Sequence, residues 1–514
     1  MTAVAASTSI VHLVRQRATD QPEHRALVVD DGTELTLGEW LERAEHLARV
    51  LVARGLRRGD RIALVIDPGA WIEYAVANLA VYLVGGVGIG FTDRLGADTV
   101  DRLAADCDAA AVLRSAGVAG RDDPDRPWWG IDELTADRAG SDDLPDLPDP
   151  AAGDGTDRIA EIVHTSGTTG PAKRVAVTHG NLTFGRDSSG ELFGGIESIL
   201  CAVPPGTNAG HSALVVALTT GSRAHVLRSI DPDAIAAAVA RDGIQHAILP
   251  PAAAAELVHS GATDRYDLTS LRALMFGSSA VPDSIVAALS QAIPTASIMI
   301  GYGSTESAPA FARRAEPAFG DDGDVERFRT AGYESLGAAG GGTEVRIVDD
   351  AGEPVAAGTI GEIALRSEAP RRFYLDVDER TAGVFAGDGW VRMGDLGVLD
   401  PDGTLRFVDR VAESIVSDGR RISSAQVENA LMWHPGVRAA AVFAVPDHDR
   451  GQLAEAAVET EGDVHGEDLL AFLADRLAPA DLPARVHVVD RLPRGVTGKV
   501  HKQVLREQYG RVRS

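Results

Sequence analysis

The sequence predicts an α/β protein in which doubly wound, mostly parallel sheets are followed by a small antiparallel, barrel-like part and a small α+β domain. Three observations support this fold class. Helix-like and strand-like segments alternate between residues 35 and 300, strands joined by turn dipeptides follow from about residue 340, and a compact mixed segment begins at Arg410. Alternating helices and strands are typical of βαβ units, whereas closely spaced strands with turn residues indicate antiparallel pairing.

The first half of the chain is predicted as helices that each lead into a strand. The helix-to-strand pairs are 35–56 to 61–66, 72–84 to 86–91, and 98–105 to 109–113. Residues 74–91 are apolar except for Asn78 and approach the length of a membrane span. Four glycines interrupt their second part, so we interpret them as a buried helix followed by a buried strand.

The remaining elements follow an acidic, proline-rich segment at 121–157, which we expect to be an exposed linker. Mostly parallel strands are predicted at 159–164, 224–227, 246–249, 271–276 and 297–300, with helical segments between them. Antiparallel strands are predicted at 343–348, 361–366 and 404–408. The C-terminal segment is predicted to contain a helix at 424–433, a strand at 437–445 and a helix at 467–476.

Composition excludes several classes of protein. The 514 residues are 45% apolar and 24% charged, which is typical of a soluble globular protein. Acidic residues outnumber basic ones by 75 to 49, and a net charge of −26 argues against nucleic acid or a membrane as partner. The two cysteines, Cys107 and Cys201, have no metal-ligand spacing, and the first residues lack a basic signal region. We therefore expect a cytoplasmic protein.

Lysine is the rarest basic residue in the chain. Of the 49 basic residues, only Lys173, Lys499 and Lys502 are lysine. Because lysine is a compact point charge and arginine a planar fork, a position that keeps lysine in such a chain is a candidate for a specific role. Lys502 has no motif of its own.

The first lysine closes a loop of hydroxyls and glycines. Residues 162–175 read Ile-Val-His-Thr-Ser-Gly-Thr-Thr-Gly-Pro-Ala-Lys-Arg-Val, so a buried strand ends at His164 and Lys173 follows the loop. Glycines allow successive N–H groups to point inward, and the hydroxyls and the ammonium add donors that suit a polyphosphate. The sequence lacks the Gly-Lys-Ser/Thr of a Walker loop. A flexible surface loop is the alternative interpretation.

Three further motifs carry groups that suit a nucleotide. Residues 297–306 end a strand with Gly-Tyr-Gly-Ser-Thr-Glu, where Tyr302 can lie against a base, Thr305 can bind phosphate and Glu306 can hold Mg²⁺. Asp395 lies in Val-Arg-Met-Gly-Asp-Leu-Gly and can accept ribose hydroxyls, and Lys499 follows a glycine in a C-terminal loop. Taken singly, the alternatives are a capped turn, an Asp-Gly turn and a solvated charge.

In their order and spacing the four motifs resemble those of the adenylate-forming superfamily, which includes acyl-CoA synthetases, peptide-synthetase adenylation domains and beetle luciferase. The resemblance extends from about residue 10 to 510. It implies an N-terminal adenylation core at 1–409, which holds the ATP and acid sites, and a small mobile lid domain at 410–514. It also implies ATP and Mg²⁺ as cofactors and a thiol such as CoA as acceptor.

The resemblance assigns roles to residues of this chain. Those expected to bind ATP are Thr165, Ser166, Gly167, Thr168, Thr169, Gly170, Gly277, Ser278, Tyr302, Asp395 and Arg410. Those expected in catalysis are Lys499, Thr305, Glu306 and Lys173, with Glu306 as the Mg²⁺ ligand and Lys499 bridging carboxylate and α-phosphate. Those expected to line the acid pocket are Thr207, Asn208, His211, Ser278, Ser279 and Ser304.

The chain departs from the family pattern at three places. Arg174 replaces a glycine after the phosphate-loop lysine, which we expect to leave ATP binding intact. Ala412 stands at the hinge where the family has Asp or Lys, which puts domain rotation and the thioester step in question. Thr207 stands where the family has His or an aromatic residue, and no Asp nearby suits the α-amino group of an amino acid.

The leading hypothesis is therefore an ATP-dependent ligase that adenylates a small or polar carboxylic acid, releases pyrophosphate and transfers the acyl group to CoA. A stand-alone adenylation enzyme that loads a carrier protein is the first alternative. A relative that activates a non-carboxylate oxyanion such as nitrite, for diazotisation of an aryl amine, is the second. A nucleotide-binding sensor without catalysis is the third, and the survival of the expected site residues argues against it.

Overall fold

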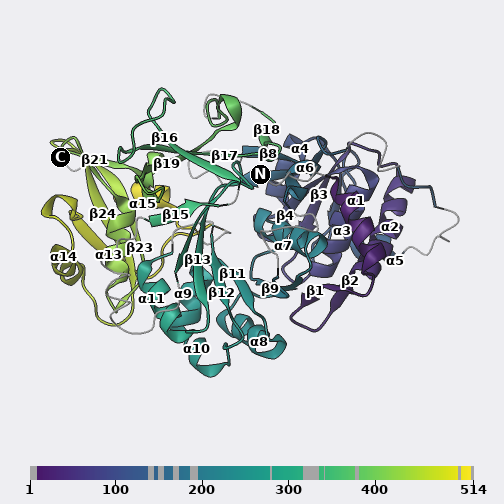
Figure 1. Cartoon of the computed structure of the whole chain (residues 1–514), viewed down its shortest axis with the longest axis horizontal. Coiled ribbons are helices and arrows are strands. Elements are labelled where there is room, and N and C mark those ends of the chain that lie inside the picture. The colour runs from purple at the N-terminus through teal and green to yellow at the C-terminus, as the bar shows by residue number, and fades with distance from the viewer. Residues whose placement is uncertain are drawn as a thin grey trace.

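The computed structural model describes residues 8–136, 144–148, 155–165, 173–185, 195–277, 281–316, 335–340, 342–376, 381–495 and 499–510. Figure 1 shows a large N-terminal part, coloured purple to green, and a smaller yellow-green part at the C-terminal end. Two sheets build the large part, and a three-stranded sheet builds the small one. The predicted fold class is confirmed.

The smaller of the two large sheets has seven strands in the order β18-β8-β7-β4-β3-β5-β6. Their bounds are β3 Arg61–Ile66, β4 Val87–Thr92, β5 Ala109–Arg114, β6 Trp128–Gly130, β7 Ile159–Thr165, β8 Lys173–Thr178 and β18 Phe373–Tyr374. The helices of this region are α1 Ile10–Asp20, α2 Leu37–Ala53, α3 Trp71–Val84, η1 Asp93–Leu95, α4 Ala97–Asp106 and α5 Ile131–Ala136. Strands β3 to β7 pair in parallel, and β8 runs antiparallel to both of its neighbours.

The apolar run at 74–91 is a buried helix and a buried strand, as predicted. It forms the end of α3 and most of β4, and Gly85 ends the helix in the left-handed conformation that glycine allows. Among the described residues, no helix is both long and apolar enough to cross a membrane.

The predicted linker at 121–157 is wrong in part. Strand β6 and helix α5 lie inside it, and Trp128 and Ile131 are buried. The reason is that β6 pairs in parallel with β5, so that the apolar pair Trp128-Trp129 extends the sheet despite its acidic flanks. Residues 137–143 and 149–154 of this segment lie outside the described residues.

The larger sheet has thirteen strands in the order β16-β17-β19-β20-β15-β14-β13-β12-β11-β9-β10-β1-β2. Their bounds are β1 Arg25–Val29, β2 Glu34–Thr36, β9 Ser198–Cys201, β10 Arg223–Val226, β11 His246–Leu249, β12 Ala273–Phe276, β13 Ser297–Tyr302, β14 Ala312–Glu316, β15 Ser335–Ala339, β16 Thr343–Val348, β17 Gly361–Ser367, β19 Val391–Leu399 and β20 Leu405–Arg410. Following the order of the sheet, the strands from β13 through β12, β11, β9 and β10 to β1 pair in parallel. The strands from β13 through β14, β15, β20, β19 and β17 to β16 pair antiparallel. The predicted antiparallel part therefore continues the parallel sheet.

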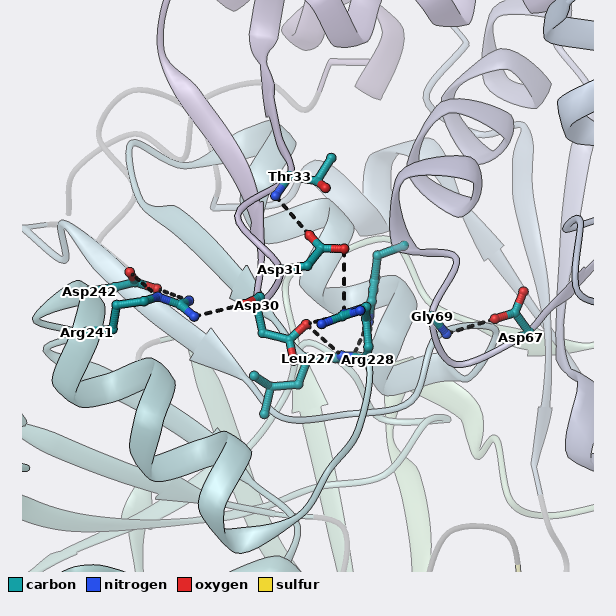
Figure 2. Close-up of polar contacts among 10 residues, drawn as sticks. Asp30, Asp31, Thr33, Asp67, Gly69, Leu227, Arg228, Arg241 and Asp242 are labelled. Carbon is teal, nitrogen blue, oxygen red and sulfur yellow. Dashed lines mark hydrogen bonds and ion pairs between the residues drawn. The ribbon is translucent and has the colours of Figure 1, made fainter. Parts of the chain in front are cut away.

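The helices of this second region are α6 His179–Thr183, α7 Asn208–Thr219, α8 Pro232–Asp242, α9 Pro251–His259, α10 Ala262–Arg265, α11 Asp283–Ala292 and η3 Gly387–Gly389. Polar contacts fix the turn after β1 to the chain around β10 and α8 (Figure 2). Arg228 Nε donates to Asp30 Oδ1 at 2.9 Å, and Arg241 Nη1 donates to the Asp30 carbonyl at 2.8 Å. Trp71 of α3 donates its indole N–H to the Leu227 carbonyl at 2.9 Å, which links the helices of one sheet to the strands of the other.

The C-terminal part consists of η4 Val411–Glu413, β21 Ile415–Ser417, β22 Arg420–Ile422, α13 Ser424–Met432, β23 Val437–Asp447, β24 Gly451–Thr460, α14 Gly466–Ala474, η5 Pro479–Asp481, β25 Arg485–Val489 and α15 Lys502–Tyr509. We call residues 410–514 the lid, keeping the predicted boundary. Apolar side chains of α11 and of α13 belong to one continuous buried cluster. The lid thus packs against the core through α13.

Candidate functional site

The predicted adenine and ribose positions meet where β13 and β20 end beside the middle of β19. Tyr302 ends β13, and the register of β19 with β20 places Asp395 opposite Arg410. The Tyr302 hydroxyl donates to Asp395 Oδ2 at 2.7 Å, and Arg410 Nε lies 3.6 Å from Asp395 Oδ1. The structure therefore brings these three predicted residues together, with Asp395 between the other two.

Burial raises the pKa of the Asp395 carboxyl, which is only 6% exposed, while the Arg410 charge and the Tyr302 hydrogen bond oppose that rise. Burial also raises the pKa of Tyr302, so its hydroxyl keeps the proton that it donates. A buried carboxylate with a fixed orientation is a suitable acceptor for a pair of ligand hydroxyls, because no reorganisation precedes binding.

Tyr374 joins the predicted Mg²⁺ ligand to the lysine of the phosphate loop. Strand β18 pairs with β8 so that Tyr374 lies opposite Val175, two residues from Lys173. The Tyr374 hydroxyl donates to Glu306 Oε1 at 2.8 Å and accepts from Lys173 Nζ at 3.4 Å. The Lys173 ammonium also lies 5.3 Å from the centre of the Tyr374 ring, within the range of a cation–π contact.

Thr305 is held from both sheets. Asn208 Nδ2 at the start of α7 donates to Thr305 Oγ1 at 3.4 Å, and Arg372 Nη1 donates to the Thr305 carbonyl at 3.0 Å. Arg372 Nε donates in turn to Asn181 Oδ1 at 2.9 Å. Burial lowers the pKa of Arg372 to about 10, against the nearby carboxylates of Glu161 and Glu306. The guanidinium stays charged at neutral pH and fixes the backbone before Glu306.

Glu306 suits Mg²⁺ bound together with a nucleotide. Enzymes that use MgATP hold the ion through one or two carboxylates and the substrate phosphates, and Glu306 supplies one carboxylate whose orientation Tyr374 fixes. No group of three or more His, Cys, Asp or Glu side chains within the described residues forms an independent metal site. The donor set therefore fits an ion that arrives with phosphate.

Lys499 approaches this site from the lid. Burial, and next the Arg410 charge, lower its pKa, while the carboxylates of Asp395, Glu413 and Glu306 oppose that shift. Asp395 and Glu306 are thus close enough to act on the ammonium electrostatically. Lys499 is therefore within electrostatic reach of residues that are expected to bind ribose and Mg²⁺.

Two of the predicted pocket residues are engaged internally. Thr207 caps α7: its Oγ1 accepts from the Gly210 N–H at 3.1 Å and donates to the Pro204 carbonyl at 2.7 Å. His211 is 5% exposed, its Nε2 lies 2.7 Å from the Tyr82 hydroxyl, and the same nitrogen contacts Glu161 Oε1. Both side chains are thus used in hydrogen bonds within the protein.

The other predicted residues lie where the strands end. Ser304 Oγ accepts from the Ser307 N–H at 3.1 Å, in the turn that carries Thr305. Thr165 pairs with Lys173 across β7 and β8, and Gly277 follows β12. The predictions for Ser166, Gly167, Thr168, Thr169, Gly170, Ser278 and Ser279 lie outside the described residues.

Sequence reasoning missed Tyr374 and Arg372. Both lie in a run, Arg-Arg-Phe-Tyr, that has neither the glycines nor the hydroxyl density of the other motifs. The rarity of tyrosine, seven in the chain, was a signal of the same kind as the rarity of lysine. Their role depends on the pairing of β18 with β8, which no local pattern encodes.

The chain is similar to known proteins over nearly its whole length. The family model described as "AMP-binding enzyme" matches residues 14–375, and the model described as "AMP-binding enzyme C-terminal domain" matches residues 426–499. A feruloyl-CoA synthase of an Amycolatopsis species is 31% identical over 96% of this chain and 98% of its own length. A long-chain-fatty-acid–CoA ligase of Mycobacterium tuberculosis is 27% identical over 97% of this chain and 98% of its own.

Among solved structures, an amide bond synthetase from Marinactinospora thermotolerans is 27% identical and superposes with a TM-score of 0.79, covering 97% of this chain and 100% of that one. The family match spans most of the chain, and the predicted membership of the adenylate-forming superfamily is confirmed. The chain belongs to the AMP-binding, adenylate-forming enzymes and is an acyl-CoA synthetase-like member of that family.

Proposed function

We propose that this enzyme activates a carboxylic acid with MgATP and transfers the resulting acyl group to the thiol of CoA. The observation that carries the proposal is the set of contacts that gathers Tyr302, Asp395 and Arg410, with Lys499 of the lid within electrostatic reach of Asp395. The CoA ligases among the relatives, matched over nearly their whole length, support CoA as the acceptor.

In the first step, a carboxylate oxygen of the acid attacks the α-phosphorus of ATP, the bond to the β-phosphate breaks, and pyrophosphate leaves with the electron pair. Negative charge grows on the phosphoryl oxygens, and the Lys499 ammonium is placed to stabilise it. When bound, Mg²⁺ would neutralise phosphate charge beside Glu306. In the second step, the thiol sulfur attacks the acyl carbon, AMP leaves with the electron pair, and the thiol proton is lost to solvent.

The acid that we propose is small or polar. Of the predicted pocket wall, Asn208 and Ser304 lie beside Thr305. The hydroxyls of Ser304 and Thr207 support the proposal less, because one accepts from the Ser307 N–H and the other caps α7. The relatives activate an aromatic and a long-chain acid by their names, so both belong in the comparison panel.

The acceptor has alternatives. Ala412 lies inside η4 at the predicted hinge, where its methyl side chain replaces the charged group of the family pattern. An acceptor other than CoA would require less rotation of the lid about that hinge. The similarity to an amide bond synthetase is a structural precedent for an amine as acceptor. Two further alternatives are a carrier protein as the acceptor, and activation of nitrite followed by reaction with an aryl amine.

One assay separates these functions. Pyrophosphate release is measured with small polar, aromatic and long-chain acids and with nitrite, each alone and with CoA, a holo-carrier protein or an aryl amine. The proposal predicts release with a small or polar acid and acceleration by CoA. Release with nitrite alone, or acceleration by an amine but not by CoA, would replace it with the corresponding alternative.

A further inference from the structure

We propose that Asn429 of the lid and Asp283 of the core act as a pair that positions Lys499 for adenylation. The inference rests on the proposed function, because it assigns the pair to the step in which Lys499 acts. Neither residue belongs to the four motifs, and the two lie 146 positions apart in the chain.

Two hydrogen bonds join the pair across the boundary between core and lid. The Asp283 backbone N–H, at the start of α11, donates to Asn429 Oδ1 at 2.9 Å. Asn429 Nδ2 donates to Asp283 Oδ2 at 3.2 Å. The carboxamide of Asn429 therefore satisfies one of the N–H groups that a helix leaves without an intrahelical partner, so α11 is capped in trans by the lid.

The pair lies at an apolar contact, with Asp283 buried and Asn429 partly buried. Asp283 is 1% exposed, and the cluster around it contains Ile285 and Leu289 of α11 together with Val427 and Leu431 of α13. A directional bond set in an apolar contact fixes the angle of two elements, whereas apolar packing alone tolerates sliding. The pair thus specifies how α13 lies on α11.

The pair contributes orientation more than free energy. Asp283 Oδ1 has no hydrogen-bond partner among the described residues, and Arg314 Nη1 lies 3.9 Å away. Burial raises the pKa of Asp283 to about 6, against the Arg314 charge and the Asn429 hydrogen bond. Burial of the Asp283 carboxylate costs hydration free energy, which is recovered when water reaches it. The lid can therefore separate from the core at α11 with little net loss of free energy from this pair.

Lys502 couples the position of α13 to the position of Lys499. Glu428 precedes Asn429 on α13, and Lys502 Nζ lies 2.7 Å from Glu428 Oε1 and 3.1 Å from Ser424 Oγ. Lys502 begins α15, three residues after Lys499. A continuous set of polar contacts therefore runs from Asp283 through α13 to the segment that presents Lys499.

The test uses single and exchanged variants in the full chain. Asn429→Asp sets two carboxylates against each other and removes a donor, whereas Asp283→Asn keeps an acceptor for Asn429. The double variant Asp283→Asn with Asn429→Asp exchanges the two side chains and restores both hydrogen bonds. Gln426→Glu is the matched control, because it adds a carboxylate at an exposed position on the same helix.

We expect Asn429→Asp to lower kcat for pyrophosphate release about tenfold, the equivalent of one charged hydrogen bond, with the KM for ATP unchanged. The exchanged double variant should recover most of that loss, and Gln426→Glu should match the wild type. Acyl transfer from a chemically prepared acyl adenylate to CoA, which bypasses adenylation, should not fall in Asn429→Asp. Wild-type pyrophosphate release in Asn429→Asp, equal losses in both steps, or failure of the exchange to restore activity would each overturn the inference.

Hydrogen exchange provides a readout that needs no substrate. The first amides of α11 should exchange faster in Asn429→Asp than in the wild type and should recover protection in the double variant. Unchanged exchange would overturn the pairing itself. If instead the wild type releases no pyrophosphate with any acid while the exchange pattern holds, the proposed function fails and the pairing of core and lid stands.

Discussion

Lys499 and Lys502 lie three residues apart on one segment of the lid, and their surroundings are opposite. Lys502 Nζ forms ion pairs with Glu413 Oε2 at 2.8 Å and Glu428 Oε1 at 2.7 Å. Burial opposes its charge, but the two carboxylates outweigh burial and raise its pKa. Lys499 has no ion-pair partner among the described residues, and burial lowers its pKa.

The difference separates a structural lysine from one suited to chemistry. The Lys502 ammonium is neutralised by two carboxylates and contributes to the stability of the lid. The Lys499 ammonium has carboxylates nearby but no ion-pair partner among the described residues, so it can still bind an anionic ligand. The rarity of lysine marks both positions equally, and only their contacts distinguish them. Lys502, which has no motif of its own, therefore forms internal ion pairs that link α13 and α15 to the hinge segment.

Among the variants that test this contrast, Lys499→Ala should have the largest effect. Removing an ammonium that stabilises the transition state should lower the rate of adenylation by about 10²–10³, as for other donors to a developing oxyanion. The unfolding midpoint in urea should stay at the wild-type value, because no ion pair is lost. A variant that keeps the wild-type rate would show that Lys499 resembles a solvated surface lysine.

Lys502→Met should mainly lower stability, and its loss of adenylation should be smaller than that of Lys499→Ala, because Lys502 only positions the segment that carries Lys499. The variant leaves Glu413 and Glu428 without their cation in a largely buried place, and we expect a loss of about 2 kcal/mol in unfolding free energy, between the values for exposed and buried pairs. Urea unfolding followed by circular dichroism measures it. Unchanged stability combined with a loss of adenylation as large as that of Lys499→Ala would reverse the assignment of the two lysines.

Tyr302→Phe tests the core residues near Lys499, namely the orientation of Asp395 by Tyr302. The variant keeps the ring and removes the hydrogen bond to Asp395, so the KM for ATP should rise by roughly five- to tenfold, equivalent to about 1 kcal/mol. The control is Tyr266→Phe, which removes a tyrosine hydroxyl in another part of the core. An unchanged KM would mean that Asp395 does not need Tyr302 for its orientation.

The pH dependence of adenylation should reflect the lowered pKa of Lys499. Because the ammonium is the active form, the rate should stay constant below that pKa and fall as pH rises through it, at a lower pH than the ordinary lysine value of 10.5. Lys502, whose pKa is raised, should stay charged over the same range and leave stability unchanged. A rate that stays constant up to alkaline unfolding would contradict a role for the Lys499 charge.

The sequence predicts what depends on local periodicity and motif. Strands β3, β11 and β16 match their predicted ranges because short apolar runs and alternating patterns identify such segments wherever they lie. Tyr302, Asp395 and Arg410 come together as the family resemblance implies. The contact of Lys173 with Tyr374 joins residues 201 positions apart and depends on strand pairing. The use of Thr207 and His211 in internal hydrogen bonds likewise depends on their neighbours in space.

The most direct test of the account is a single-turnover measurement of pyrophosphate release by Lys499→Arg at saturating MgATP and acid. Arginine keeps the charge but replaces a compact ammonium with a planar fork, which we expect not to fit between the carboxylate and the α-phosphate. The account predicts loss of most of the adenylation rate with ATP binding retained. Pyrophosphate release at nearly the wild-type rate would contradict it.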